Sequence, residues 1–316
     1  MRLKNICIFG VGGVGGYFGG RIAYEIAQQK NSPQKVFFIA RGKHLAHIQR
    51  QGLILNTAEK QGLLCKPAMA TDRVEDIPTP DLYLLCVKSY DLDGTVNAIS
   101  KNMNRDTIVI PLLNGVDIYE RIRHILQTGI VLPACVYVGT HIEQPGVVTQ
   151  KGGDGAILCG KDPRVPDVNP QEITDFFTRL HINFQWKDDP YPDIWGKYLF
   201  ISAFGLVTAY SGETLGEVMA DPETKGLVRQ IMAEVVAIAA KKGVQLPENS
   251  LEVALNKANN FPYDTKTSYQ RDVATRGKKN EGDLFGGTIV RMGRELGVQT
   301  PVTQRIFTEI QRNYSA

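Results

Sequence analysis

The chain has 316 residues, 43% of them hydrophobic and 22% charged, with a formal net charge of +3 at pH 7. This length exceeds what one core usually organises, so we expect two domains. No apolar run approaches the roughly 20 residues of a membrane-spanning helix, and no basic stripe suited to nucleic acid is present. We therefore expect neither a membrane nor a nucleic-acid partner and, because the N-terminus lacks a signal-peptide pattern, a cytoplasmic protein.

The cysteines and histidines give no sign of a disulfide framework or a metal site. None of the five cysteines has C-x-x-C spacing, so we expect them to be small core residues. Of the five histidines only His44 and His47 lie close together, and no acidic or cysteine partner completes a ligand set. We expect no metal.

From residue 1 to about 188, short strand-like runs alternate with helical patterns. The runs are KNICIFG, KVFFIAR, DLYLLCVK, DTIVIPLLN and GIVLPACVYV. Runs that are apolar on both faces and separated by helices predict a parallel sheet covered by helices. Further strand candidates at 147–150, 155–160 and 182–186 are expected to extend this sheet. The predicted class is α/β.

A glycine-rich loop follows the first strand, in the segment IFGVGGVGGYFGG. Gly10, Gly12 and Gly15 match G-x-G-x-x-G, which permits a tight turn, close approach of a pyrophosphate and close packing of the next helix. An anion would then meet a helix N-terminus. The alternative is an ordinary glycine-rich turn, but the position between a strand and a helix favours dinucleotide binding. The candidate cofactor contacts are Gly10, Gly12, Gly13, Val14 and Gly15.

The end of the second strand, FFIARGKHL, indicates which dinucleotide binds. NAD-specific folds place Asp or Glu at this point, whereas this chain has Arg41 and we expect no carboxylate there. A guanidinium suits a 2′-phosphate through bidentate hydrogen bonds, so NADP is the predicted cofactor. The alternative is that Arg41 is merely solvated at a strand end. Lys43 is a second candidate for the phosphate.

Two further side chains follow strands at the carboxyl edge, where open α/β sheets bind ligands. Lys88 ends one strand and Asn114 ends the next. The Asn114 amide could hold a nicotinamide ribose or a substrate oxygen. The alternatives are a surface lysine and a turn asparagine.

The sequence after residue 188 is helical throughout. We expect domains at 1–188 and 189–316, joined by a hinge in DDPYPD (188–193). Asp or Thr before a helix, Pro in its first turn and Gly after its end mark the boundaries. These signals predict one helix that begins at Asp221-Pro222 and ends at Gly243. Two other helices are predicted to end at Gly277 and at Gly297, and the last helix is predicted to begin at Thr300-Pro301. The second domain is predicted to be all-α.

One helix, IWGKYLFISAFGLVTA (194–209), is apolar nearly all round and carries a single lysine, Lys197. Such a helix is expected to be buried on most sides. In one interpretation, the aliphatic part of Lys197 is packed and its ammonium group reaches water. In the other, the ammonium group is partly desolvated, which would lower its pKa and let it protonate a developing alkoxide. Such a lysine needs a carboxylate to orient it. Residues 266–287 offer Glu281, Asp283, Ser268 and Asp272, although Glu281 could equally be a first-turn residue favoured by the helix dipole.

The chain resembles the ketopantoate reductase (2-dehydropantoate 2-reductase) family nearly end to end. The resemblance rests on the glycine loop, Arg41 and the segments VKSY, LLNGV, QPGVV, WGKYL, TSYQRDV, RGKKNEGDLFGG and LGVQTPV. It implies a Rossmann-type domain followed by a helical domain. It also implies an enzyme of pantothenate biosynthesis that reduces ketopantoate, a 2-oxo acid, to pantoate with NADPH.

The resemblance also implies a role for each site residue. Lys197 would be the general acid that protonates the C2 oxygen while NADPH delivers hydride to that carbon. Asn114 would contact both the cofactor and the substrate, and Ser268 would bind the substrate carboxylate. Lys88 and the backbone at Ile142 would contact the cofactor. Glu281 would bind the cofactor and position the lysine.

Two departures from the family pattern bear on the substrate. The family helix carries asparagines four and eight residues after the lysine, where this chain has Ile201 and Gly205. Each lost partner costs roughly 1 to 3 kcal/mol of binding, so the substrate is either bound differently or is another 2-oxo acid or ketone. The segment before Glu281 is one residue longer than in the family, so Asn280 competes for its role. A non-catalytic NADP(H)-binding regulator is a third hypothesis, and a homodimer is possible.

Overall fold

The computed structural model describes residues 3–275 and 277–315, so Arg276 of the RGKKNEGDLFGG segment lies outside the described residues. The chain divides into two compact units. The first comprises Met1–Leu113 and Ile118–Pro190, and the second comprises Asn114–Asp117 and Tyr191–Ala316. The short segment Asn114–Asp117 therefore packs with the helical unit although it lies within the first half of the sequence.

The first unit contains a six-stranded sheet in the order β5-β2-β1-β6-β7-β8, with every neighbouring pair parallel. The central strands β6 and β7 are buried at every position, as their continuous apolar runs predict. This is the Rossmann-type sheet expected from the sequence. Its strands are β1 (Asn5–Phe9), β2 (Lys35–Ile39), β5 (Met69–Thr71), β6 (Leu82–Leu85), β7 (Ile108–Pro111) and β8 (Ile130–Val131).

A second sheet of five strands holds the segments that were expected to extend the first, so that expectation is wrong. The chain from 147 to 160 is one long strand that pairs antiparallel with the strand before it around a turn at Pro145-Gly146. Strands joined by so short a turn pair antiparallel with each other, and β10 pairs parallel with β3 and β11 of the second sheet. The strands are β3 (Leu53–Asn56), β4 (Leu63–Cys65), β9 (Ala134–Gln144), β10 (Val147–Gly160) and β11 (Phe184–Lys187).

The run GIVLPACVYV, read as one strand from the sequence, is divided between the two sheets. Its first part is β8 of the parallel sheet and its second part is β9. Pro133 stands at the break, where its missing N–H removes one ladder donor.

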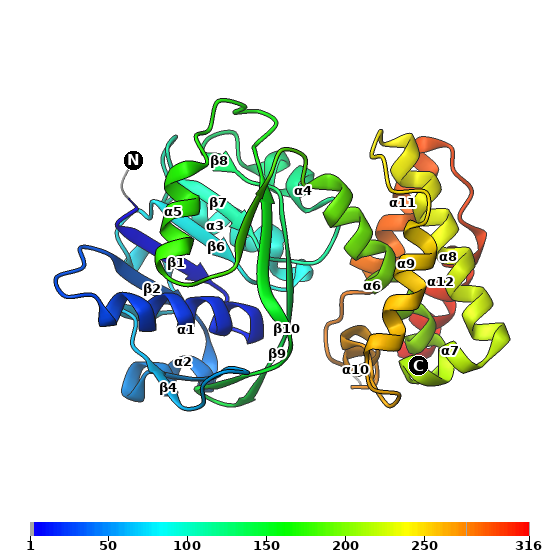
Figure 1. Ribbon diagram of the computed structural model, residues 1–316, viewed down its shortest axis with the longest axis horizontal. Coiled ribbons are helices and arrows are strands. Elements are labelled where there is room, and N and C mark those ends of the chain that lie inside the picture. The colour runs from blue at the N-terminus through cyan, green and yellow to red at the C-terminus, as the bar shows by residue number, and fades with distance from the viewer. Residues whose placement is uncertain (1–2, 276, 316) are drawn as a thin grey trace. The chain divides into compact units, whose positions relative to one another are not determined.

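Helix α1 (Gly13–Gln28) packs between the two sheets, against β2 on one side and β3, β4, β9 and β10 on the other (Figure 1). Glycines on both sides of the helix permit this close approach. A Cβ added to Gly16 would lie 2.5 Å from Val148 Cγ2, and one added to Gly19 would lie 2.8 Å from Ile8 Cγ1. The helix that begins at the glycine loop is therefore fixed by packing on two layers.

The remaining helices of the first unit lie around the sheets. A buried ion pair joins two of its elements: the Arg123 guanidinium on α4 donates to Asp162 just after β10, and the Tyr119 hydroxyl donates to the same carboxylate at 2.7 Å. The helical elements are α2 (Gly42–Gln51), η1 (Val74–Asp76), η2 (Ser89–Asp91), α3 (Leu92–Ile99), α4 (Ile118–Ile125) and α5 (Gln171–Arg179).

The second unit is built around α6 (Tyr191–Ser211), the helix that carries Lys197 (Figure 1). It contacts α8, α9, α10, α12 and η4, and most of its residues are buried. The prediction that this all-round apolar helix is buried is confirmed. The other elements are α7 (Leu215–Ala220), α8 (Pro222–Lys241), α9 (Ser250–Lys257), η3 (Ala258–Asn260), α10 (Ser268–Val273), the π-helix η4 (Asp283–Gly287), α11 (Thr288–Leu296) and α12 (Pro301–Ser315).

The helix boundaries follow the sequence signals at the starts of α8 and α12 and at the end of α11, and they depart from the signals at the end of α10. The Asp221 carboxylate caps α8, and Gly297 ends α11 with a φ of +69°. However, α10 ends at Val273, well before Gly277. The first N–H groups of α12 are bonded by the Glu234 carboxylate from α8, a tertiary cap that Thr300-Pro301 does not reveal.

Among the described residues, no helix is both long enough and apolar enough to cross a bilayer.

Candidate active site

The glycine loop forms a tight turn between β1 and α1. Gly10 has a φ of +91°, its N–H donates to Ile39 O at 2.9 Å, and the Gly12 N–H donates back to Gly10 O at 2.8 Å. A Cβ on Gly15 would lie 2.2 Å from Gly10 O, so only glycine fits there. Gly13, Val14 and Gly15 form the first turn of α1, whose N–H groups have no partners within the helix and which contains no acidic residue. This turn is suited to an anion such as a pyrophosphate.

Thr140 on β9 lies against the start of α1 and was not singled out from the sequence. A Cβ on Gly13 would lie 2.8 Å from Thr140 Oγ1, and this buried hydroxyl has no hydrogen-bond partner in the described part of the chain. Ile142, two residues further, shares the Thr140 face of the strand and is 42% exposed. The predicted cofactor contact Ile142 therefore belongs to the strand face that meets the glycine loop.

Arg41 follows β2 directly, and its side chain is 80% exposed. Its Nη2 donates to Asp91 Oδ2 at 2.7 Å. Asp91 ends η2, the turn that begins after the half-buried Lys88, and its side chain is 25% exposed. The expectation that no carboxylate is available here is wrong, because η2, the turn that follows β6, supplies one. Asp91 could have been noticed in the sequence, since it follows a strand that ends at the same edge.

In the second unit, Lys197 and Asn114 are in direct contact. The half-buried Lys197 donates from Nζ to Asn114 Oδ1 at 2.8 Å. The far end of the Asn114–Asp117 segment is held as well, because the Thr288 hydroxyl of α11 donates to Asp117 Oδ2 at 3.2 Å. The Asn114 amide oxygen thus orients the ammonium group of Lys197.

The acidic candidates of residues 266–287 differ in their surroundings. Asp272 accepts from Lys278 Nζ at 2.6 Å, and Asp283 forms an ion pair with Arg291. Glu281 is only 4% exposed. Its competitor, Asn280, uses its side-chain oxygen to accept from the Gly282 N–H at 2.9 Å within its own turn.

Tyr198, the neighbour of Lys197, ties α6 to the segment that contains Glu281. Its hydroxyl donates to Leu284 O at 2.7 Å and to Phe285 O at 2.9 Å, both in the π-helix η4. A π-helix shifts the i−4 hydrogen-bond pattern, and such turns are frequent at functional sites. This contact is not predictable from the sequence, because a tyrosine on an apolar helix has the same pattern as a core residue.

Ser268 is exposed at the first position of α10, next to the buried Tyr269. The Thr208 hydroxyl of α6 lies 2.8 Å from the hydroxyl of Thr267, so α10 starts against α6. Lys197, Ile201 and Gly205 succeed one another on one face of α6. A Cβ on Gly205 would meet only Tyr269, at 3.8 Å, so this position has room for a side chain.

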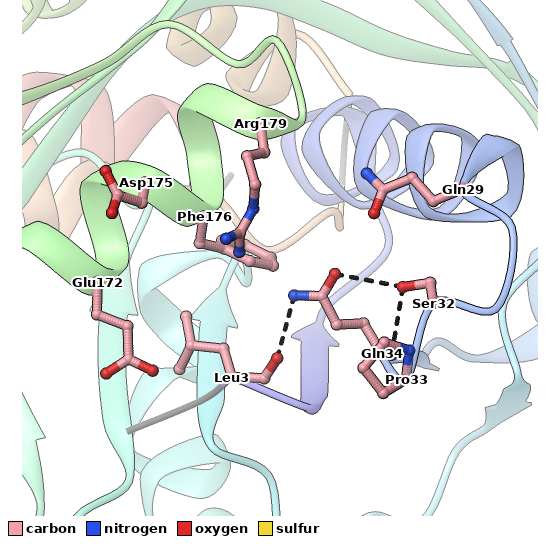
Figure 2. A pocket seen from close by; sticks show the side chains of 9 residues that line it. All are labelled: Leu3, Gln29, Ser32, Pro33, Gln34, Glu172, Asp175, Phe176 and Arg179. Carbon is pink, nitrogen blue, oxygen red and sulfur yellow. Dashed lines mark hydrogen bonds between the residues drawn. The ribbon is translucent and has the colours of Figure 1, made fainter.

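A hollow of about 400 Å³ in the first unit is lined by other residues. Figure 2 shows it between the N-terminal segment, the end of α1 and α5, where Gln34 Nε2 donates to Leu3 O at 3.1 Å. Leu3 precedes β1 whereas the glycine loop follows it, so the hollow is at the opposite end of that strand. It contains none of the predicted cofactor residues.

The parallel sheet with its glycine turn, followed by a helical unit that presents an oriented lysine, defines an NAD(P)-dependent oxidoreductase. The described residues contain no group of three or more His, Cys, Asp or Glu that could hold a metal. Residues 6–164 match the family described as Ketopantoate reductase PanE/ApbA, and residues 190–313 match Ketopantoate reductase PanE/ApbA C terminal. The chain belongs to the ketopantoate reductase family.

Individual relatives share this organisation over their full length. A PanE/ApbA family ketopantoate reductase from Ralstonia eutropha superposes with a TM-score of 0.88 at 26% identity, covering 99% of both chains. A 2-dehydropantoate 2-reductase of Streptococcus pyogenes is 24% identical, covering 93% of this chain and 94% of its own. A D-mandelate dehydrogenase solved with NADH and anilino(oxo)acetate has a TM-score of 0.85 at 19% identity, covering 99% of both chains, which shows a shared fold.

Proposed function

We propose that this protein reduces the C2 carbonyl of a 2-oxo acid to a hydroxyl with NADPH, and that ketopantoate is its leading substrate. The observation that carries the proposal is the hydrogen bond from Lys197 to the Asn114 amide, which holds a proton donor in a defined direction. Membership of the ketopantoate reductase family supports the reaction class. The glycine turn at the start of α1 supports the cofactor.

The bound cofactor supplies the hydride that adds to C2. Lys197 donates its proton to the substrate oxygen as negative charge develops there, and the neutral amine is reprotonated from water. Asn114 fixes the direction of the ammonium group, and its amide nitrogen is available to the substrate. The exposed Ser268 hydroxyl donates to the substrate carboxylate. The balance is one 2-oxo acid, one NADPH and one proton giving one 2-hydroxy acid and one NADP⁺.

Further residues complete the proposed site. Glu281 positions the lysine and contacts the cofactor, a role consistent with its burial and with the link from Tyr198 to the adjacent π-helix. Lys88 and the backbone at Ile142 contact the cofactor. Arg41 binds the 2′-phosphate of NADPH.

A second candidate substrate is a 2-oxo acid with a wholly apolar side chain. Ile201 and Gly205, one and two turns after Lys197, have no side-chain hydrogen-bonding group. A hydroxyl of ketopantoate placed beside them would lose its water without a replacement partner, which costs roughly 1 to 3 kcal/mol. An apolar substituent would carry no such cost.

Steady-state kcat/KM with NADPH across a panel of ketopantoate, 2-oxoisovalerate, phenylpyruvate and benzoylformate distinguishes the candidates. Fastest turnover of ketopantoate supports the leading substrate, whereas faster turnover of an apolar acid supports the second. A protein that binds NADPH but reduces no oxo acid would be the non-catalytic regulator, and the proposal would fail.

Substitution of the lysine tests the mechanism separately. Lys197→Ala should lower kcat by about 10² to 10⁴-fold and leave the Kd for NADPH unchanged. Lys241→Ala, at the exposed end of α8, removes the same charge as a control. An unchanged kcat in Lys197→Ala would exclude the lysine as the proton donor.

A further inference from the structure

The ion pair between Arg41 and Asp91 spans the carboxyl end of β1. In the sheet β2 and β6 flank β1 on either side. Arg41 follows β2, and Asp91 lies in the turn that follows β6, yet Nη2 and Oδ2 are 2.7 Å apart. The pair therefore lies at the edge where Gly10 turns into α1, which is the edge that binds dinucleotides in sheets of this type.

The two members of this pair favour different cofactors. In such sheets, the residue at the end of the second strand contacts the adenosine ribose of the cofactor. An arginine there binds the 2′-phosphate of NADP, whereas a carboxylate accepts a hydrogen bond from the 2′-hydroxyl of NAD. Here the arginine follows the second strand, and the carboxylate reaches the same point from η2, the turn that follows β6. Both recognition elements are present together.

We propose that Asp91 is a specificity-determining residue, which accepts from the ribose 2′-hydroxyl of NADH and so lets this enzyme use NADH as well as NADPH. The inference rests on the proposed function only in that the glycine loop holds an NAD(P) cofactor.

The charges determine how the pair responds to each cofactor. A 2′-phosphate carries about −1.5 to −2 charges at pH 7, and it would contact the guanidinium that Asp91 already contacts, so the two anions repel each other. The exposed guanidinium can turn from Asp91 to the phosphate with little loss, because solvent-exposed ion pairs are weak. NADPH therefore binds through Arg41 against the repulsion of Asp91, and NADH binds through Asp91.

Removing the Asp91 charge should move the two affinities in opposite directions. In Asp91→Asn, we expect the Kd for NADPH to fall by about 3 to 10-fold and the Kd for NADH to rise by about tenfold, the scale of one charge-assisted hydrogen bond. Arg41→Ala should do the reverse, weakening NADPH far more than NADH. In the wild type the two Kd values should lie within about tenfold of each other.

The measurement is a titration of cofactor fluorescence with NADPH and with NADH on the full chain, with circular dichroism to verify folding. Asp93→Asn is the matched control, because it removes the same charge from an exposed position on α3 two residues further on. This control should leave both Kd values within about twofold, since exposed charges at a distance are screened.

The outcomes separate this inference from the proposed function. If Asp91→Asn leaves the ratio of the two Kd values unchanged, or weakens NADPH, Asp91 does not determine specificity and the inference is overturned. Arg41→Ala binding the two cofactors with equal losses would also overturn it. A wild-type protein that binds neither cofactor would instead overturn the proposed function.

Discussion

Lys197 Nζ lies 2.8 Å from Asn114 Oδ1, although the two residues are 83 positions apart in the sequence. The acceptor in this contact is a neutral amide. An amide oxygen orients an ammonium group, but it stabilises the charged form less than a carboxylate at the same distance would. Such a partner suits the proton donor proposed here, because a general acid must release its proton in each cycle.

Asn114→Asp should therefore make Lys197 a poorer acid. A carboxylate at this distance favours the ammonium form and would raise the pKa of Lys197. Since activity requires the protonated lysine, the alkaline limb of the kcat/KM profile should move to higher pH while kcat falls. The profile is measured between pH 6 and 10. Asn256→Asp adds the same charge at an exposed position of α9 and should leave the limb in place. An unmoved limb in Asn114→Asp would show that another group controls it.

Gly205 is a helix-interior glycine with room for a side chain. Gly205→Ala should stabilise the protein by about 0.5 to 1 kcal/mol, because alanine loses less backbone entropy in a helix and its Cβ would meet only Tyr269 at 3.8 Å. Gly216 of α7 is the contrasting position, since a Cβ there would lie 2.3 Å from the Tyr263 ring and 2.6 Å from its carbonyl oxygen. Gly216→Ala should destabilise. Urea unfolding of both variants checks this, and a destabilised Gly205→Ala would mean that the space beside α6 is filled.

His44 predicts a dependence of stability on pH. Its Nδ1 accepts from the Gly146 N–H at 3.0 Å, and its Nε2 is buried without a hydrogen-bond partner among the described residues. Burial lowers the pKa of His44 below 6.5, and the nearby His47 lowers it further. Because the unfolded chain takes up this proton more readily than the folded one, stability should fall as the pH drops below about 6.5.

Urea unfolding at pH 7.5 and 5.5 measures this loss. His44→Gln should lose less stability between the two pH values than the wild type does. His124→Gln, at an exposed position on α4, should behave like the wild type. Equal losses in His44→Gln and the wild type would assign the dependence to other groups.

Local patterns were sufficient to predict the fold class. The spacing of apolar residues identifies the parallel strands and the buried α6, and the residues at helix ends identify the ends of α8 and α11. Each of these signals depends on neighbours within a few residues of the chain. The second sheet was missed because assigning a strand to a sheet depends on which partner it meets. The turn at Pro145-Gly146 contains the information that β9 and β10 pair with each other, but the apolar pattern alone does not.

The candidate site was predictable to different extents. The glycine loop follows from its own spacing, whereas the family resemblance implied separate substrate contacts for Lys197 and Asn114, and their mutual hydrogen bond was not predicted. The contact of Asp91 with Arg41 was not predicted because it joins segments that follow two strands far apart in the chain, β2 and β6. Thr140 gave no signal, since a hydroxyl on a strand has no periodic pattern.

Glu234 provides a long-range cap that a stability measurement can test. From α8 this carboxylate accepts from the N–H groups of Val302 and Thr303 at 2.9 and 3.1 Å and from the Thr303 hydroxyl at 2.5 Å, and it is 9% exposed. Glu234→Ala leaves these donors at the start of α12 without their acceptor and should cost about 2 to 3 kcal/mol of unfolding free energy. Glu234→Gln retains one oxygen acceptor and should cost less. Glu248→Ala, in the exposed segment before α9, is the control for loss of charge in urea unfolding. If Glu234→Ala were as stable as that control, water would be replacing the carboxylate at the first turn of α12, and the cap would contribute nothing to holding this helix on α8.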